Sequence, residues 1–310
     1  MKKIISFFTT TFIFFNLSAF NPLDFTDFTS NLTFTIGSES QTITEKRELH
    51  PYSLNKFETT YSLWYKTRIA AEKKGYHFEN PGQAGTDGKR GAIPTEETEN
   101  QPVTMISWYD AIVWCNALSE QNNLTPCYTF NGKIIKDSSD MASCDLCDCN
   151  WNANGYRLPT EAEWELSARS GINEIYPSDL IAGQKKNTSD EDYLLYAWTF
   201  ENATESRVVG TAGVPFDPNS IAQPATGNAT EKGLFDMTGN VLEFCWDWYA
   251  DYSKTEQTGP KIGYERVSRG GSYSEYTMFT STGDRYSYSP DVVYNYFGFR
   301  LAKTYLSETR

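Results

Sequence analysis

This chain of 310 residues has few of the side chains that zinc, nucleic-acid or membrane binding uses. Its two histidines, His50 and His77, lie far in the sequence from the cluster of cysteines. Because a zinc site needs four thiolate or imidazole ligands, this spacing argues against one. Lys and Arg number 27 against 40 Asp and Glu, which gives a net charge of −13. Nucleic acids and anionic membranes both require concentrated positive charge, so we expect neither as a partner.

The chain also lacks a long apolar run at its start. Residues 4–15 are apolar but too few to span a bilayer as a stable helix. They follow the basic residues 1–3 and precede Leu17-Ser18-Ala19, which together predict a signal peptide over residues 1–19. Bacterial lipoprotein signals resemble Leu-Ser-Ala followed by a lipidated Cys, whereas this chain has Phe20. We therefore expect an exported protein, at the cell surface or outer membrane or extracellular, with a lipid anchor at position 20 only if the native residue is Cys.

The six cysteines fit that compartment. Two of them, Cys115 and Cys245, lie singly within apolar patterns and are predicted to be buried free thiols. The other four are disulfide candidates, and the sequence leaves their pairing open: Cys127, Cys144, Cys147 and Cys149.

Local patterns place several elements along the chain. Residues 20–31 read as a spacer, followed by strands at Leu32–Gly37 and Tyr52–Phe57 and a helix from Thr59 to Lys74. Two further helices begin with capping boxes, at Ser107 with Asp110 and at Thr160 with Glu163. Residues 172–232 are loop-rich, and no internal repeat divides the chain. We therefore expect one domain over residues 32–303.

The segment Arg266–Lys303 has an unusual composition. Six of the 20 tyrosines fall between Tyr273 and Tyr296, mixed with Ser, Asp and Asn. These tyrosines fit half-buried strands of an ordinary sheet, which composition alone favours. They also fit a binding surface, because antibody paratopes combine rigid Tyr with small polar residues.

Four blocks together resemble one family. They are Gln101–Ala111, Asn154–Glu165, Gly233–Glu243, and Arg269–Ser272 with Gly298–Leu301. In this order they are similar to the sulfatase-modifying-factor (formylglycine-generating-enzyme-like) family, over about residues 32–303. The resemblance implies an α+β, C-type-lectin-like fold, in which two helices pack on small twisted antiparallel sheets with much irregular loop.

The same resemblance predicts that the family's enzyme activity is absent. Formylglycine-generating enzymes bind copper through two cysteines that follow the Gly-Gly-Ser turn, and this chain has Glu275 and Thr280 at those positions. No cysteine follows Cys245, so copper has no thiolate ligands. The related iron-dependent enzymes need three histidines, whereas this chain has only two, His50 and His77. We therefore expect a protein that is not an enzyme and binds neither copper nor iron.

Some proteins of this fold are the variable proteins of bacterial diversity-generating retroelements. Their C-terminal segment is rewritten by mutagenesis of AAY codons, which cannot yield Lys, Gln, Trp, Glu or Met. Between Ser274 and Tyr296 this chain has no Lys, Gln or Trp, with Glu275 and Met278 as exceptions. The resemblance thus predicts a diversified patch for protein ligands within segment 268–303. The residues expected to vary and bind are Ser274, Glu275, Tyr276, Phe279, Asp284, Tyr286, Tyr288, Asp291, Tyr294, Asn295 and Tyr296.

Two alternative functions remain open from the sequence. An enzyme of this fold with different chemistry would need a cluster of titratable groups near Glu275, Asp284 and Arg285. A structural or carbohydrate-binding lectin-like protein would need exposed acidic residues at a loop tip to bind sugar through a metal.

The resemblance also implies one structural calcium. In the family the ligands are side-chain oxygens at the positions of Asp236 and Glu243 and carbonyls at those of Gly239 and Val241. Hard oxygen ligands in a tight turn suit calcium. The alternative is a turn in which Asp236 caps backbone N–H groups and Glu243 is solvated. The family's second calcium site has no counterpart in Tyr196–Asp217.

Overall fold

The structure is a computed structural model that describes residues 20–30, 32–38, 43–174, 176–184, 194–252 and 258–306. The predicted signal peptide lies outside these ranges, and so does the last residue of the predicted spacer. Among the helices in the described ranges, none has the length and apolar character that crossing a bilayer requires.

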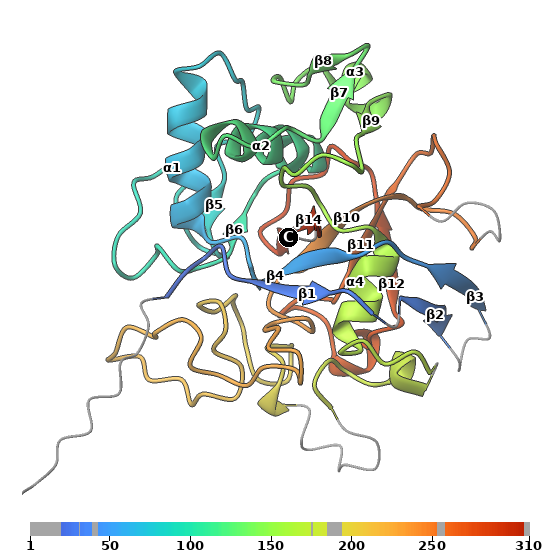
Figure 1. Ribbon diagram of the computed structural model, residues 1–310. Helices are drawn as coiled ribbons and strands as arrows, with labels where there is room; N and C mark the ends of the chain where they lie inside the picture. Colours follow the sequence, from blue (N-terminus) through green and yellow to red (C-terminus); the bar gives the residue numbers. More distant parts are fainter. Residues whose placement is uncertain are drawn as a thin grey trace, which may run out of the picture.

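One sheet joins the two ends of the domain. Strand β4 (Tyr52–Glu58) lies between β1 (Phe25–Phe28) and β14 (Arg300–Thr304), and both pair with it antiparallel (Figure 1). The prediction of a spacer over residues 20–31 therefore needs correction, because β1 belongs to the folded domain. Its Phe28 is buried, and its ring stacks on that of Tyr52 with centroids 4.9 Å apart.

The predicted helices form where their caps indicate. Helix α1 (Tyr61–Glu72) begins after Thr60, and α2 (Trp108–Gln121) and α4 (Glu161–Ala168) begin with the capping boxes of Ser107 and Thr160. A short fourth helix, α3 (Met141–Asp145), lies in the cysteine loop. The structure thus has four α-helices in its described residues, where the resemblance implied two.

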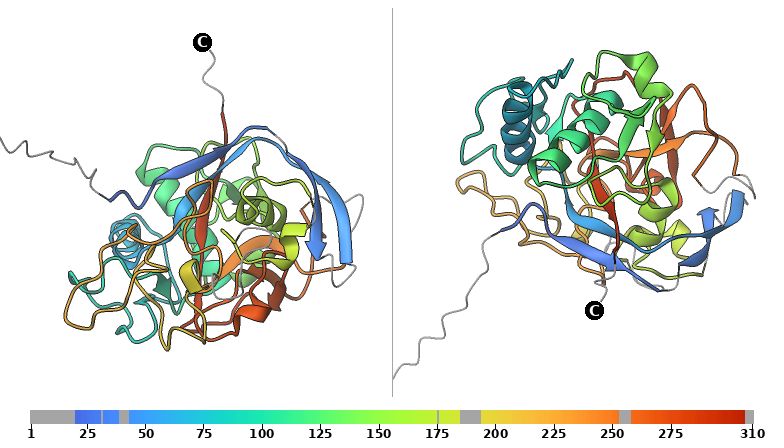
Figure 2. Two further views of the ribbon diagram at one scale, coloured as in Figure 1. Left: turned by 90° about the horizontal axis from the view of Figure 1, so that it is seen from below. Right: turned by 45° about the horizontal axis from the view of Figure 1, so that its top comes forward.

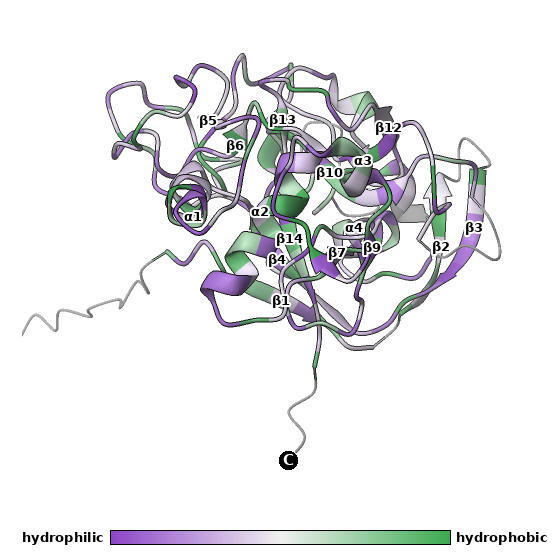
Figure 3. Cartoon of the chain, turned by 90° about the horizontal axis from the view of Figure 1, so that it is seen from above, coloured by the Kyte–Doolittle hydropathy of each residue, from purple (hydrophilic) through white to green (hydrophobic). Residues whose placement is uncertain are grey.

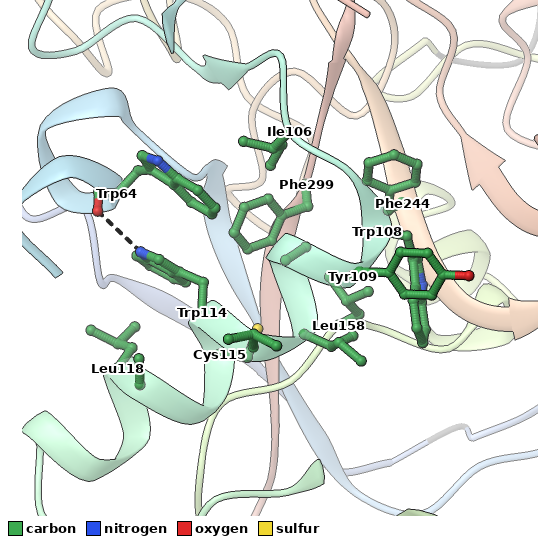
Figure 4. Packing of buried hydrophobic residues seen from close by; sticks show 14 of the residues in the cluster. Trp64, Ile106, Trp108, Tyr109, Trp114, Cys115, Leu118, Leu158, Phe244 and Phe299 are labelled. Atoms are coloured by element: carbon green, nitrogen blue, oxygen red, sulfur yellow. Dashed lines mark hydrogen bonds between the residues drawn. The ribbon is translucent and has the colours of Figure 1, made fainter. Parts of the chain in front are cut away.

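Helices α1 and α2 pack against each other through tryptophans (Figure 4). The rings of Trp64 and Trp114 stack with centroids 5.5 Å apart, and the Trp114 indole N–H donates to the Trp64 carbonyl at 3.1 Å. Phe299 meets both rings edge-on, which ties the helix pair to the chain just before β14. Aromatic pairs of this kind contribute roughly 0.5–1.5 kcal/mol beyond the area they bury.

A four-stranded sheet lies beside this core in the order β12-β11-β10-β13. Its strands are β10 (Leu242–Trp248), β11 (Arg266–Arg269), β12 (Arg285–Tyr288) and β13 (Phe297–Gly298). Both β11 and β12 are antiparallel to their neighbours, while β13 runs parallel to β10. Three of the four strands therefore come from the Tyr-rich segment.

The remaining strands form three small antiparallel sheets. They are β2 (Thr33–Ser38) with β3 (Ile43–Glu48), β5 (Gln83–Ala84) with β6 (Val103–Thr104), and β8 (Lys133–Ile134) with β7 (Tyr128–Phe130) and β9 (Asp148–Cys149). Two 3-10 helices, η1 (Tyr176–Asp179) and η3 (Thr277–Phe279), complete the described elements.

The architecture confirms the predicted α+β fold with much irregular loop. From residue 196 to 241 the chain forms turns and a single isolated bridge, between Trp198 and Gly239 (Figure 2, yellow to orange). Apolar stretches follow α2, β13 and β14 through the middle of the molecule (Figure 3). All six cysteines are free thiols, so the structure contains none of the predicted disulfides.

Candidate ligand-binding surface

A tight turn presents the Tyr-rich segment. Gly270 and Gly271 follow β11 with φ of 93° and 69°, positive values that glycine adopts without steric cost. A Cβ on Gly271 would lie 2.2 Å from Thr280 Cγ2, so a larger residue cannot fit unless the buried Thr280 side chain moves. The turn therefore brings η3 back against the end of β11.

Four arginines of the segment point inward and fix it to the core. Arg285 of β12 donates two hydrogen bonds, of 2.6 and 2.8 Å, to the Glu161 carboxylate at the start of α4. Arg269 and Arg300 are fully buried and pair with Glu165 and Glu243.

The fourth arginine, Arg266, forms no ion pair with any residue in the described ranges. The Arg266 guanidinium lies 3.6 Å from the ring centroid of Trp108 and 3.4 Å from that of Trp248. Burial lowers its pKa to about 9. Sequence reasoning did not identify these four arginines as anchors, because Arg is mostly an exposed residue.

The four inward arginines and the turn form a frame, and the residues predicted to bind lie on its outside. None of the eleven is buried. Five are exposed, namely Ser274, Tyr276, Phe279, Asp291 and Tyr294. Six are partly exposed, namely Glu275, Asp284, Tyr286, Tyr288, Asn295 and Tyr296. Buried residues lie just before and between them and fix the path of the backbone, namely Ser272, Thr277, Thr280 and Thr282.

Several of the tyrosines contact one another or the same core ring. The rings of Tyr294 and Tyr296 stack with centroids 5.2 Å apart, and Tyr288 meets Phe297 edge-on at 4.7 Å. The Tyr286 hydroxyl donates to the carbonyl of Phe279 and so joins β12 to η3. Burial raises the pKa of Tyr296 to about 12. These contacts fix the rings, which lowers the entropy lost when a ligand binds.

Two further residues extend this surface and were not among those predicted. Phe200 comes from the long loop, and its ring lies 4.7 Å from that of Tyr276. Met278 of η3 is 76% exposed. Phe200 lies 76 residues before Tyr276 in the sequence, and no pattern pointed to it. Met278 was set aside because AAY codons do not yield Met.

The geometry does not gather Glu275, Asp284 and Arg285 into one catalytic cluster. The Asp284 carboxylate accepts from the N–H and hydroxyl of Ser281, at 2.8 and 2.9 Å, and closes a turn. Arg285 faces Glu161, on the core side of β12. Thr280, the second position at which the family's enzymes have a copper-binding cysteine, is fully buried and donates to the Thr277 carbonyl.

The predicted calcium ligands lie in a buried ion-pair network. Both oxygens of Glu243 accept from the Arg300 guanidinium, at 2.6 and 2.7 Å, and one also accepts the Trp164 indole N–H at 2.8 Å. Asp236 accepts the N–H of Gly210 through Oδ2, while Oδ1 is buried and has no hydrogen-bond partner among the residues that the structure describes.

These contacts fit a calcium ion poorly, because the guanidinium already occupies Glu243. Glu243 is buried, contrary to the alternative in which it is solvated, and Asp236 caps a backbone N–H as that alternative expected. Burial raises the pKa of Asp236 to about 6. The Gly239 and Val241 backbone follows the same turn, and Glu58 accepts the Val241 N–H. Within the described ranges, no group of three or more His, Cys, Asp or Glu side chains is arranged to hold a metal ion.

Two sizeable cavities lie elsewhere on the molecule. One of about 590 Å³ is lined by residues such as His50, Trp151 and Arg157. Another of about 380 Å³ is lined by Trp198, Arg207 and Phe216, among others. Neither is lined by residues of segment 268–303, so these hollows do not belong to the Tyr-rich surface.

Comparisons with known proteins agree on one family. The family described as sulfatase-modifying factor enzyme 1-like domain matches residues 28–305. The chain is 36% identical over 182 residues to the chaperone protein LppX of Paenibacillus barcinonensis, covering 56% of this chain and 60% of that protein. It is 30% identical over 219 residues to the formylglycine-generating enzyme of Mus musculus, covering 67% of this chain and 45% of the enzyme. The chain thus spans about half the length of these curated relatives.

Solved structures extend the similarity over nearly the whole chain. Treponema denticola variable protein 1 superposes with a TM-score of 0.70 at 28% identity, covering 91% of this chain and 95% of that protein. CarF superposes with a TM-score of 0.65 at 26% identity, covering 92% and 99%.

Proposed function

Since the chain belongs to the family of sulfatase-modifying factor enzyme 1-like domains, we propose that it is a non-catalytic member that binds protein ligands through its diversified C-terminal surface. In this proposal the frame stays constant, and the residues from Ser274 to Tyr296 change to recognise different partners. The protein acts after export, at the cell surface or in the extracellular space.

The observation that carries this proposal is the division of segment 268–303 into two sides. Every residue predicted to vary is at least partly exposed, while the three arginines of the same segment pair with buried glutamates. Surface substitutions usually change stability by less than about 0.5 kcal/mol, so such a surface tolerates many sequences. The similarity to a variable protein of Treponema denticola supports the same function.

An enzyme remains the second candidate, because formylglycine-generating enzymes are also relatives. The two positions where the resemblance implies copper-binding cysteines are Glu275 and Thr280 here, and neither side chain is a thiolate. Oxidation of a substrate cysteine in the family's manner therefore has no ligands for its metal.

The DNA downstream of the gene tests the proposal directly. We expect a near-copy of codons 268–303 that differs mainly at adenines, beside a gene for a reverse transcriptase. Sequencing the segment from several cultures of the source cell should then give differences concentrated at the eleven predicted positions. A single invariant segment without a second copy would refute diversification, and the tyrosines would then be ordinary sheet residues.

A further inference from the structure

One carboxylate in the Tyr-rich surface is held in place without a cation. The Glu275 Oε2 accepts the backbone N–H of Ser272 at 2.8 Å and also the Ser272 hydroxyl. Ser272 is fully buried and follows the glycine turn, so this contact fixes the carboxylate to the frame. No ion pair found among the described residues includes Glu275. The segment's Arg269 and Arg285 are held by Glu165 and Glu161 instead.

Tyrosines lie next to this carboxylate, because Ser272, whose N–H it accepts, directly precedes Tyr273, and Tyr276 directly follows Glu275. Its negative charge contributes, after burial, to raising the pKa of four hydroxyls, those of Tyr273, Tyr286, Tyr288 and Tyr296. Tyr296 also packs against the cluster that contains Tyr273, and it stacks with Tyr294. The faces of aromatic rings attract cations, and this interaction contributes about 0.5–2 kcal/mol, more where the site is desolvated.

Covering this surface with a protein partner would remove water from Glu275. A buried carboxylate without a counter-charge is costly, so a partner that offers only apolar groups is disfavoured. A positively charged side chain would satisfy the carboxylate and stack on the tyrosines at the same time. The net charge of −13 also favours approach of a basic segment.

We propose that Glu275 and the tyrosines around it form a site for a cationic side chain, lysine or arginine, presented by a protein partner. This inference rests on the proposed function, because it names the chemistry of the ligand that the C-terminal surface takes. Apolar side chains lie next to Glu275 along the chain or in space, namely Phe200, Tyr276, Met278 and Phe279. They would contact aliphatic or aromatic residues that flank the cationic residue in the partner.

The test uses four capped pentapeptides of glycine with one central residue: arginine, lysine, citrulline or norleucine. Each peptide is titrated into the mature protein with its tyrosine rings labelled with 13C, and ring signals are followed by NMR. We expect saturable shifts of Tyr286, Tyr288 and Tyr296 with the two cationic peptides, and binding weaker by about tenfold or more with the neutral ones, as one ion pair supported by ring faces would give.

The variant Glu275→Gln should lose that preference for cations. Gln retains an oxygen that accepts from Ser272, so the fold and its melting midpoint should persist. The matched control is Glu265→Gln, which neutralises an exposed carboxylate that is not among the eleven residues predicted to bind and that accepts the Ser287 hydroxyl at 2.6 Å. Glu265→Gln should bind the cationic peptides like the wild type.

Equal binding of arginine and citrulline peptides would overturn the proposed cation site, and so would unchanged cation binding by Glu275→Gln. These failures are separable from failure of the proposed function. If a rewritten copy of codons 268–303 exists but the protein shows no preference for cationic peptides, the proposed function stands and the cation site is wrong. If the protein prefers cationic peptides but no second copy exists, the cation site stands and diversification is wrong.

Discussion

The ion pair between Arg285 and Glu161 gives a sharp test of how the surface is held. The two side chains are 11% and 4% exposed, and two hydrogen bonds of 2.6 and 2.8 Å join them. Replacing Arg285 by Met leaves the Glu161 carboxylate buried, with the Arg269 Nε at 3.7 Å and the Tyr252 hydroxyl at 3.3 Å. Breaking a buried pair from one side costs about 3–5 kcal/mol.

That loss is a large part of the total, because the free energy of unfolding of a domain is about 5–15 kcal/mol. We expect Arg285→Met to lower the urea midpoint strongly, measured by the fluorescence of the buried tryptophans. The double variant Arg285→Met with Glu161→Gln should recover part of the loss, since it removes the buried charge that Arg285 balances in the wild type. Ser287→Ala on the same strand, which loses only a bond to exposed Glu265, is the control and should change stability by less than about 1 kcal/mol. A loss below about 1 kcal/mol for Arg285→Met, or a double variant no more stable than the single one, would refute this reasoning.

Three further predictions concern buried groups and the turn. Burial, together with the Glu161 carboxylate, raises the pKa of Asp247 to about 7, so the folded protein keeps this proton and loses stability as pH rises from about 4 through about 7. Asp247→Asn lacks this titration, and its free energy of unfolding relative to the wild type should rise by up to about 4 kcal/mol over that range, measured by urea unfolding at several pH values. If the predicted calcium site binds its ion, a chelator will lower the melting midpoint, and an unchanged midpoint counts against the site. Gly271→Ala places a Cβ 2.2 Å from Thr280 at positive φ and should lower the free energy of unfolding by more than about 1 kcal/mol, measured by thermal melting. The control is Gly75→Ala, which has open space around the new Cβ and φ of 84° and therefore tests the backbone strain alone.

Local signals predicted the helices and the turn well. A capping box needs only residues three apart, so Ser107 with Asp110 and Thr160 with Glu163 were recognisable before any fold was known. A glycine pair commonly marks a tight turn, and both Gly270 and Gly271 adopt the positive φ that such a turn uses.

Contacts between distant residues could not be predicted in the same way. Strand β1 pairs with β4 about 27 residues later, and nothing in residues 25–28 distinguishes it from an exported protein's spacer. Arg300 and Glu243 are 57 residues apart, and the family resemblance assigned Glu243 to calcium instead. The residues predicted to vary were identified through codon composition, which carries information that periodicity does not, and all of them lie on the outside of the segment.

In the proposed function, strand β12 is both an anchor of the segment and part of its variable surface. Side chains alternate along a strand, so Arg285 reaches Glu161 while Tyr286 bonds the carbonyl of Phe279 on η3. Changing a tyrosine at 286 or 288 alters what a partner meets and leaves the register with β11 intact, because that register depends on backbone bonds and on Arg285. A protein that must keep its fold while its binding residues change needs this separation, and the four inward arginines provide it. We therefore expect loss of stability to follow the arginines and loss of binding to follow the tyrosines.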